Sequence, residues 1–78
     1  MQAPTTQEVR DYFIHNTKGS LWIPTKTRNE IIAEENFSSK PKTIVNGKVY
    51  RFLFKSIGGG MWEVSLGDLS GNPLREKE

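Results

Sequence analysis

The residues that could bind a charged partner are concentrated in the second half of the chain. Residues 36–62 contain five basic side chains and no acidic one, although all 78 residues together have a formal net charge of only +2. Such clustering is typical of a surface that contacts nucleic-acid phosphates. The predicted nucleic-acid-binding residues are Lys42, Lys48, Arg51 and Lys55. Arg51 is the best suited to a base edge, because its guanidinium can donate two parallel hydrogen bonds. The pattern does not separate DNA from RNA.

Apolar residues interleave with these charges. The predicted protein-interface residues are Ile44, Val49, Leu53 and Met61. An apolar patch ringed by charge indicates a protein interface, a homodimer contact or a surface that the chain itself covers. The alternative function is therefore a protein-interaction module or inhibitor. Whether a partner or residues 20–24 cover the patch stays open at this point.

Three further groups have residue types that could carry chemistry. Asp11 and His15 stand one helical turn apart, as a carboxylate that orients a general base would. The other two groups are Glu30, Glu34 and Glu35, which could bind Mg²⁺, and Gly58, Gly59 and Gly60, which could expose amides to an anion. A helix surface pair, a solvated acidic face and a hairpin loop explain them more simply. We predict no enzyme, catalytic residue, metal, cofactor or small-molecule substrate.

Two helical stretches precede the basic half. Thr5 and Glu8 form a predicted capping box, and Val9 and Phe13 share one face behind it, which predicts a helix over 6–16. A second capping box, at Thr27 and Glu30, predicts a helix over 28–36, with Phe37 at its far end and Ile31 and Ile32 toward the core. Between them, Leu21–Ile23 before Pro24 is either a short edge strand or an extended connector.

The strongest local signal is Asn46-Gly47 between two β-prone runs. This dipeptide is typical of a two-residue hairpin turn, whose residues both need positive φ. It predicts strands over 42–45 and 48–55, followed by a loop over 56–60 and a third strand over 61–66.

This arrangement sorts the side chains between two faces of the sheet. The loop length pairs Lys55 with Met61, Phe54 with Trp62, Phe52 with Val64 and Tyr50 with Leu66. The aromatic face is then the core and the basic face points outward. Both Trp62 and Trp22 are expected in the core. For Trp22 the alternative role is an exposed anchor for a binding partner.

The predicted fold class is α+β. One or two N-terminal helices pack on one face of an antiparallel three-stranded meander, with an optional short edge strand at 20–23. Residues 1–66 form one small domain, and 67–78 form a polar turn and a frayed tail in which Leu69 and Leu74 dock locally. A winged helix is the structural alternative, but its recognition helix over 28–36 would be too acidic to face phosphate.

Composition limits the remaining classes. The absence of cysteine excludes a disulfide framework and favours a reducing, cytoplasmic location. No apolar run is long enough to span a membrane, and no signal peptide is visible. The chain resembles small bacterial and phage accessory proteins in type only, through its size and layout, and that resemblance assigns no residue a role. The leading prediction is a small nucleic-acid-binding accessory protein.

Overall fold

The first helix, α1 (Thr6–His15), begins at the predicted capping box. In the computed structural model, which describes residues 4–34 and 41–74, the Thr5 hydroxyl accepts from the Glu8 amide and the Glu8 carboxylate accepts from the Thr5 amide. This exchange satisfies two amides that the first turn leaves unpaired. Val9 and Phe13 are fully buried on the inner side of α1, as their spacing predicts. The predicted helix over 6–16 is confirmed to within one residue.

The second helix, α2 (Thr25–Glu34), begins three residues earlier than predicted. It follows directly on β1 (Ser20–Pro24), and the backbone amide and hydroxyl of Thr25 both donate to the Gly60 carbonyl at 3.0 Å. Thr27 lies inside the helix, is buried, and donates its hydroxyl to the Pro4 carbonyl at 2.9 Å. The capping box predicted at Thr27 and Glu30 is therefore wrong, because the Thr27 hydroxyl bonds the N-terminal segment instead. Phe37 and the predicted end of this helix lie outside the described residues.

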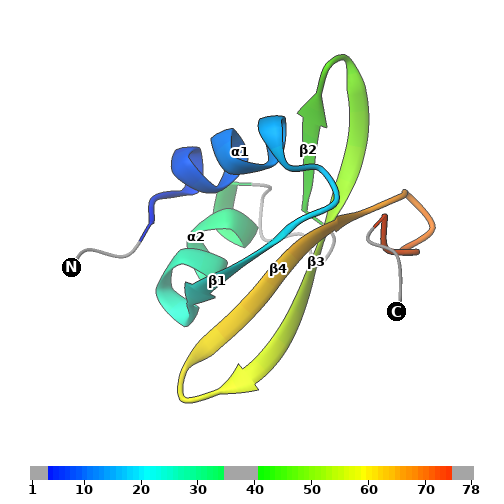
Figure 1. Ribbon diagram of the computed structural model, residues 1–78. Helices are drawn as coiled ribbons and strands as arrows, with labels where there is room; N and C mark the ends of the chain where they lie inside the picture. The colour runs from blue at the N-terminus through cyan, green and yellow to red at the C-terminus, as the bar shows by residue number, and fades with distance from the viewer. Residues whose placement is uncertain (1–3, 35–40, 75–78) are drawn as a thin grey trace.

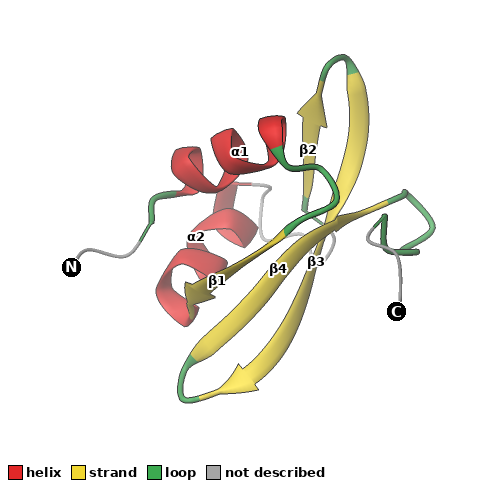
Figure 2. Cartoon of the chain, in the orientation of Figure 1, coloured by secondary structure: helices red, strands yellow, loops and turns green. Residues whose placement is uncertain are grey.

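The sheet has four strands in the order β1-β4-β3-β2, and all neighbours are antiparallel. After β1 come β2 (Lys42–Val45), β3 (Lys48–Gly58) and β4 (Met61–Gly67). Both helices lie on one side of this sheet, while the β2–β3 and β3–β4 hairpins extend from its opposite ends (Figures 1 and 2). The α+β prediction is confirmed, and the optional edge strand at 20–23 is present as β1.

The β3–β4 register differs from the predicted one by two residues. Phe54 lies opposite Val64 and Phe52 opposite Leu66, whereas Trp62 lies opposite Ser56. The predicted pairs are wrong because β3 runs on to Gly58 with a bulge between Ser56 and Gly58, so that only Gly59 and Gly60 form the turn. Both turn glycines have positive φ, 63° and 75°, as a two-residue hairpin turn of this hand requires. A shift of two keeps every side chain on its predicted face.

The core lies between the helices and the inner face of the sheet. Its buried residues are Val9, Phe13, Ile23, Ile31, Val45, Phe52, Val64 and Leu66. The rings of Phe13 on α1 and Phe52 on β3 pack with centroids 6.1 Å apart, which joins the first helix to the middle of the sheet. The aromatic face is thus the buried one, as predicted.

Beyond β4 the chain turns back on itself. Gly67 pairs with Pro73, and the Leu74 amide donates to the Leu66 carbonyl at 3.1 Å, so that Leu74 packs against the core. Leu69 instead remains 60% exposed, so the predicted docking holds for Leu74 and is wrong for Leu69. The Asp68 carboxylate holds the turn by accepting from the amides of Ser70 and Asn72.

Candidate functional site: the outer sheet face

The sheet face opposite the helices carries most of the residues that the sequence singles out. We call it the outer sheet face. By strand alternation its large and charged members are Trp22, Lys42, Ile44, Val49, Arg51, Leu53, Lys55, Met61 and Glu63, and Ser20 and Ser65 lie among them. The register arranges them in rows across the strands: Ile44 lies opposite Val49 at the β2–β3 tip, and Trp22, Glu63 and Lys55 form a row across β1, β4 and β3.

The four predicted nucleic-acid-binding residues are only partly brought together. Lys42 and Arg51 are direct cross-strand neighbours, and Lys55 follows on the same face four residues further along β3, about 13 Å away at the rise of a strand. Lys48 lies opposite the buried Val45 and so points to the helix side, where its Nζ is 5.5 Å from the centroid of the Tyr50 ring. The four basic residues therefore form one close pair, Lys42 and Arg51, with Lys55 further along the same face and Lys48 on the opposite face, rather than one continuous patch.

Arg51 is held by the C-terminal turn. Its Nη1 atom approaches Gly71 so closely that a Cβ built on that glycine would lie only 2.9 Å away. The Nε atom is shielded from water and has no hydrogen-bond partner. A half-buried guanidinium packed in this way is less free to follow a base edge than an extended arginine would be.

The four predicted interface residues spread along the whole outer sheet face. Ile44 and Val49 are exposed to 66% and 39%, whereas Leu53 and Met61 are half-buried. A Cβ built on Gly67 would meet Leu53 Cδ1 at 2.7 Å, so this leucine packs over the glycine at the end of β4. The exposed apolar area is thus concentrated at the hairpin tip.

Trp22 adds a second exposed apolar site at the other end of the face. It is 63% exposed on β1, while its neighbours Leu21 and Ile23 face the core. The prediction that Trp22 serves the core is wrong, because a strand sends alternate side chains to opposite faces. The same alternation shows that residues 20–24 extend the sheet rather than cover its outer face. The sequence signal for this is the alternation itself: once Leu21 and Ile23 are assigned to the core, Trp22 between them must lie on the opposite face.

Trp62 has a structural role on the helix side. Its indole Nε1 donates to the Thr25 hydroxyl at 3.0 Å, and the Arg28 guanidinium lies over the ring at 4.3 Å from the centroid. Gly60, which follows the bulge, is tied to the same Thr25 by its carbonyl. The glycine run therefore forms a hairpin turn whose last carbonyl anchors α2.

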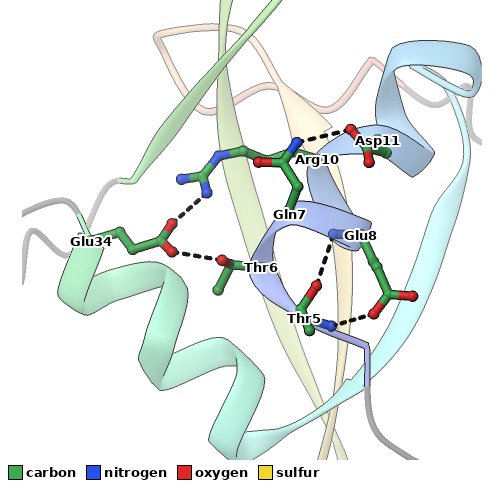
Figure 3. A network of polar contacts seen from close by, with 7 residues as sticks. All are labelled: Thr5, Thr6, Gln7, Glu8, Arg10, Asp11 and Glu34. Carbon is green, nitrogen blue, oxygen red and sulfur yellow. Dashed lines mark hydrogen bonds and ion pairs between the residues drawn. The ribbon is translucent and has the colours of Figure 1, made fainter.

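Two of the candidate carboxylates of the helices, Asp11 and Glu34, are engaged in local bonds, whereas Glu30 is exposed. Asp11 accepts from the Gln7 side chain at 2.9 Å, and Glu34 accepts from the Thr6 hydroxyl and the Arg10 guanidinium (Figure 3). Chiefly the Thr6 hydrogen bond, and then that of Arg10, holds the pKa of Glu34 below its ordinary value. Glu35 lies outside the described residues. Within 4–34 and 41–74, no three His, Cys, Asp or Glu side chains gather in a group able to hold a metal ion.

Comparison with known proteins assigns no family. No family model matches the chain, and neither the curated proteins nor the solved structures include a significant match to it. No helix in the described part of the chain is long and apolar enough to cross a membrane. The functional argument therefore rests on the chain's own surface.

Proposed function

We propose that this protein is a non-enzymatic protein-interaction module that binds its partner through the outer sheet face. The observation that carries the proposal is the exposure of Trp22 and Ile44 on a sheet whose two helices both lie on the other side. Large apolar side chains left on a surface and ringed by charge are typical of protein interfaces. Tryptophan in particular is enriched among the residues that contribute most to binding.

The charges of the outer sheet face support a protein partner as well. Lys55 and Glu63 stand side by side next to Trp22, which gives this end of the face mixed charge rather than a single sign. Mixed charge around an apolar anchor favours orientation and specificity in a protein complex. Because the chain has no cysteine, we place this interaction in a reducing compartment, the cytoplasm.

A photocrosslinking experiment tests the proposal. A photoreactive amino acid at Met61, which is diagonal to Trp22 on the outer sheet face, is compared with one at Glu30 on the exposed side of α2. We expect a crosslinked protein from Met61 only. The purified partner should then bind the intact chain and lose at least about tenfold in affinity on Trp22→Ala or Ile44→Asp.

Ile14 supplies the matched control. It is also apolar and is 42% exposed, but it lies on α1. Ile14→Asp should leave the affinity unchanged. Equal loss on Ile14→Asp and Ile44→Asp, or full affinity in the Trp22→Ala variant, contradicts the proposal. Sedimentation equilibrium of the chain alone separates a second copy from a different protein as the partner.

Nucleic acid is the second candidate partner. The observation in its favour is the cross-strand pair Lys42 and Arg51, with Lys55 on the same face. It predicts amide shifts at these three residues on titration with short duplex DNA at low salt. Binding should weaken steeply with salt, with a logarithmic slope of about −0.9 for each phosphate neutralised. No shifts at any salt concentration would remove nucleic acid as a partner and favour the protein-interaction function instead.

A further inference from the structure

The two edges of β3 are unequally paired. β4 pairs with it from Arg51 to Gly58, whereas β2 pairs only from Lys48 to Arg51. The last bond on the β2 side is from the Phe52 amide to the Pro41 carbonyl, at 2.9 Å. Among residues 4–34 and 41–74, no segment pairs with β3 on this side beyond Phe52. Figure 1 shows the lower half of β3 as the edge of the sheet.

Strand alternation fixes which backbone groups point to this edge. The Phe52 amide faces β2, so the amides and carbonyls of Phe54 and Ser56 face the same way. Leu53 and Lys55 direct theirs to β4. An edge of this kind is a template for an extended segment of another protein. We call the stretch from Phe52 to Ser56, on this side, the β3 edge.

A shallow pocket of about 240 Å³ lies along the β3 edge. Its lining is Arg28, Arg51, Phe52, Leu53, Phe54 and Trp62. The lining includes four consecutive residues of β3, which places the pocket along that strand. Arg28 reaches it from α2 on the helix side, and Arg51 belongs to the outer side of the same strand.

The Arg28 guanidinium is held in place by aromatic rings, but its positive charge has few hydrogen-bond partners. Its central carbon is 4.3 Å from the centroid of the Trp62 ring and 5.7 Å from that of Phe54. Nη1 donates to the exposed Asn29 side chain at 3.1 Å, and Nε is shielded from water without a partner. In the described part of the chain, no carboxylate forms an ion pair with Arg28 or Arg51. A stacked guanidinium with so few partners gains strongly from a carboxylate.

We propose that the β3 edge binds an extended acidic segment of a partner protein. The segment pairs its backbone with Phe54 and Ser56 and continues the sheet. Its side chains alternate between the helix side, where a carboxylate reaches Arg28, and the outer side, toward Lys55 and Arg51. A nucleic acid could meet the arginines but not the amide ladder, which is why the geometry favours a peptide. This site shares Arg51 and Lys55 with the outer sheet face but uses neither Trp22 nor Ile44, so its test is independent of the test of the proposed function.

The direct test is an amide titration of the labelled chain with a capped peptide that has two central glutamates flanked by valine and threonine. We expect shifts at Phe54, Ser56 and Arg28. A peptide of the same sequence with glutamine for glutamate should bind at least about tenfold more weakly. Arg28→Gln should abolish the difference between the two peptides, and Lys26→Gln, on the exposed side of the same helix, should preserve it.

Three outcomes overturn the proposal. The first is equal binding of both peptides to the intact chain. The second is slow hydrogen exchange at the edge of the free protein. If the amides of Phe54 and Ser56 exchange as slowly as those of Leu53 and Lys55, the β3 edge is already paired. The third is binding of the wrong class of ligand: a single-stranded oligonucleotide shifts the amides of Phe54 and Ser56, and the acidic peptide does not. Because Arg28 packs on Trp62, Arg28→Lys provides a second variant that keeps the charge; it should retain the preference for glutamate, though more weakly.

Discussion

Arg10 on α1 and Glu34 on α2 form an ion pair that joins the two helices across their exposed sides (Figure 3). The same carboxylate accepts from the Thr6 hydroxyl at 2.6 Å, so that one acidic side chain near the end of α2 bonds two residues of α1. Apart from this pair, the two helices make more contacts with the sheet than with each other. This pair therefore adds a polar contact between the helices to the packing that each makes on the core.

The Glu34 bonds predict a pH-dependent contribution to stability. Its pKa in the folded chain is lowered, so the contribution is present above the ordinary pKa of 4.5 and is lost as the pH falls through the lowered value. Glu34→Gln should reduce the free energy of unfolding at neutral pH by less than about 1 kcal/mol, because the pair is exposed. Urea unfolding across this pH range should show the two proteins converging in acid.

The choice of variant matters for this test. Arg10 also lies 6.0 Å from the centroid of the Phe52 ring, so replacing it changes core packing as well as charge. Glu34→Gln avoids this. A stability difference that persists unchanged in acid contradicts the assignment to the Glu34 carboxylate.

Replacing the adjacent β1 residues Trp22 and Ile23 should have very different effects on stability. Ile23 is fully buried and Trp22 is 63% exposed. Ile23→Ala should lower the free energy of unfolding by about 2–4 kcal/mol, because it leaves a cavity under α2. Trp22→Ala should change it by no more than about 0.5 kcal/mol. Thermal or urea unfolding of both variants measures this, and a large loss for Trp22→Ala means that the outer sheet face is covered in solution.

Local sequence signals predicted most of the fold. Asn46-Gly47 fixed the first hairpin, because its two residues have the positive φ that the turn requires, 52° and 80°. The glycine run 58–60 predicted a turn but not its length, since three successive glycines can each adopt positive φ and allow several registers. The faces were still correct, because the difference of two residues preserves alternation.

The candidate site was less predictable because it depends on contacts between residues far apart in the sequence. The positions of Lys48 and Lys55 follow from strand alternation and could be derived. Arg51 packs against Gly71, a contact across twenty residues that no local pattern encodes. The β3 edge likewise arises from the unequal lengths of β2 and β3, which no local pattern in β3 encodes. Tertiary contacts of this kind decide which charged side chains are accessible.

Gly67 predicts a steric effect where the C-terminal turn meets the sheet. A Cβ at this position would lie 2.7 Å from Leu53 Cδ1 and 2.9 Å from the Asn72 carbonyl oxygen. The leucine end can rotate away, but the carbonyl belongs to the backbone of the turn. Gly67→Ala should therefore cost about 1–3 kcal/mol of unfolding free energy. The double variant Gly67→Ala, Leu53→Ala should not recover stability, whereas recovery would show that the leucine alone limits the space.

Asp68 predicts how the C-terminal turn responds to acid. Hydrogen bonds, chiefly from the Asn72 amide, hold the pKa of this carboxyl below its ordinary value. The stabilisation is therefore present above the ordinary pKa of 3.8 and is lost as the pH falls through the lowered value. Hydrogen exchange at the Ser70 and Asn72 amides, corrected for the intrinsic pH dependence, should accelerate over that interval.

The variant that isolates this carboxylate is Asp68→Ala. It should produce fast exchange at Ser70 and Asn72 at neutral pH, and it should also loosen Leu74, whose amide bonds Leu66 beyond the turn. Asp68→Asn keeps an acceptor oxygen and should restore part of the protection. Ser70→Ala is the control, because the turn uses the amide of Ser70 and not its hydroxyl. Exchange that is unchanged in Asp68→Ala would show that the Gly67–Pro73 pairing holds the turn without the carboxylate.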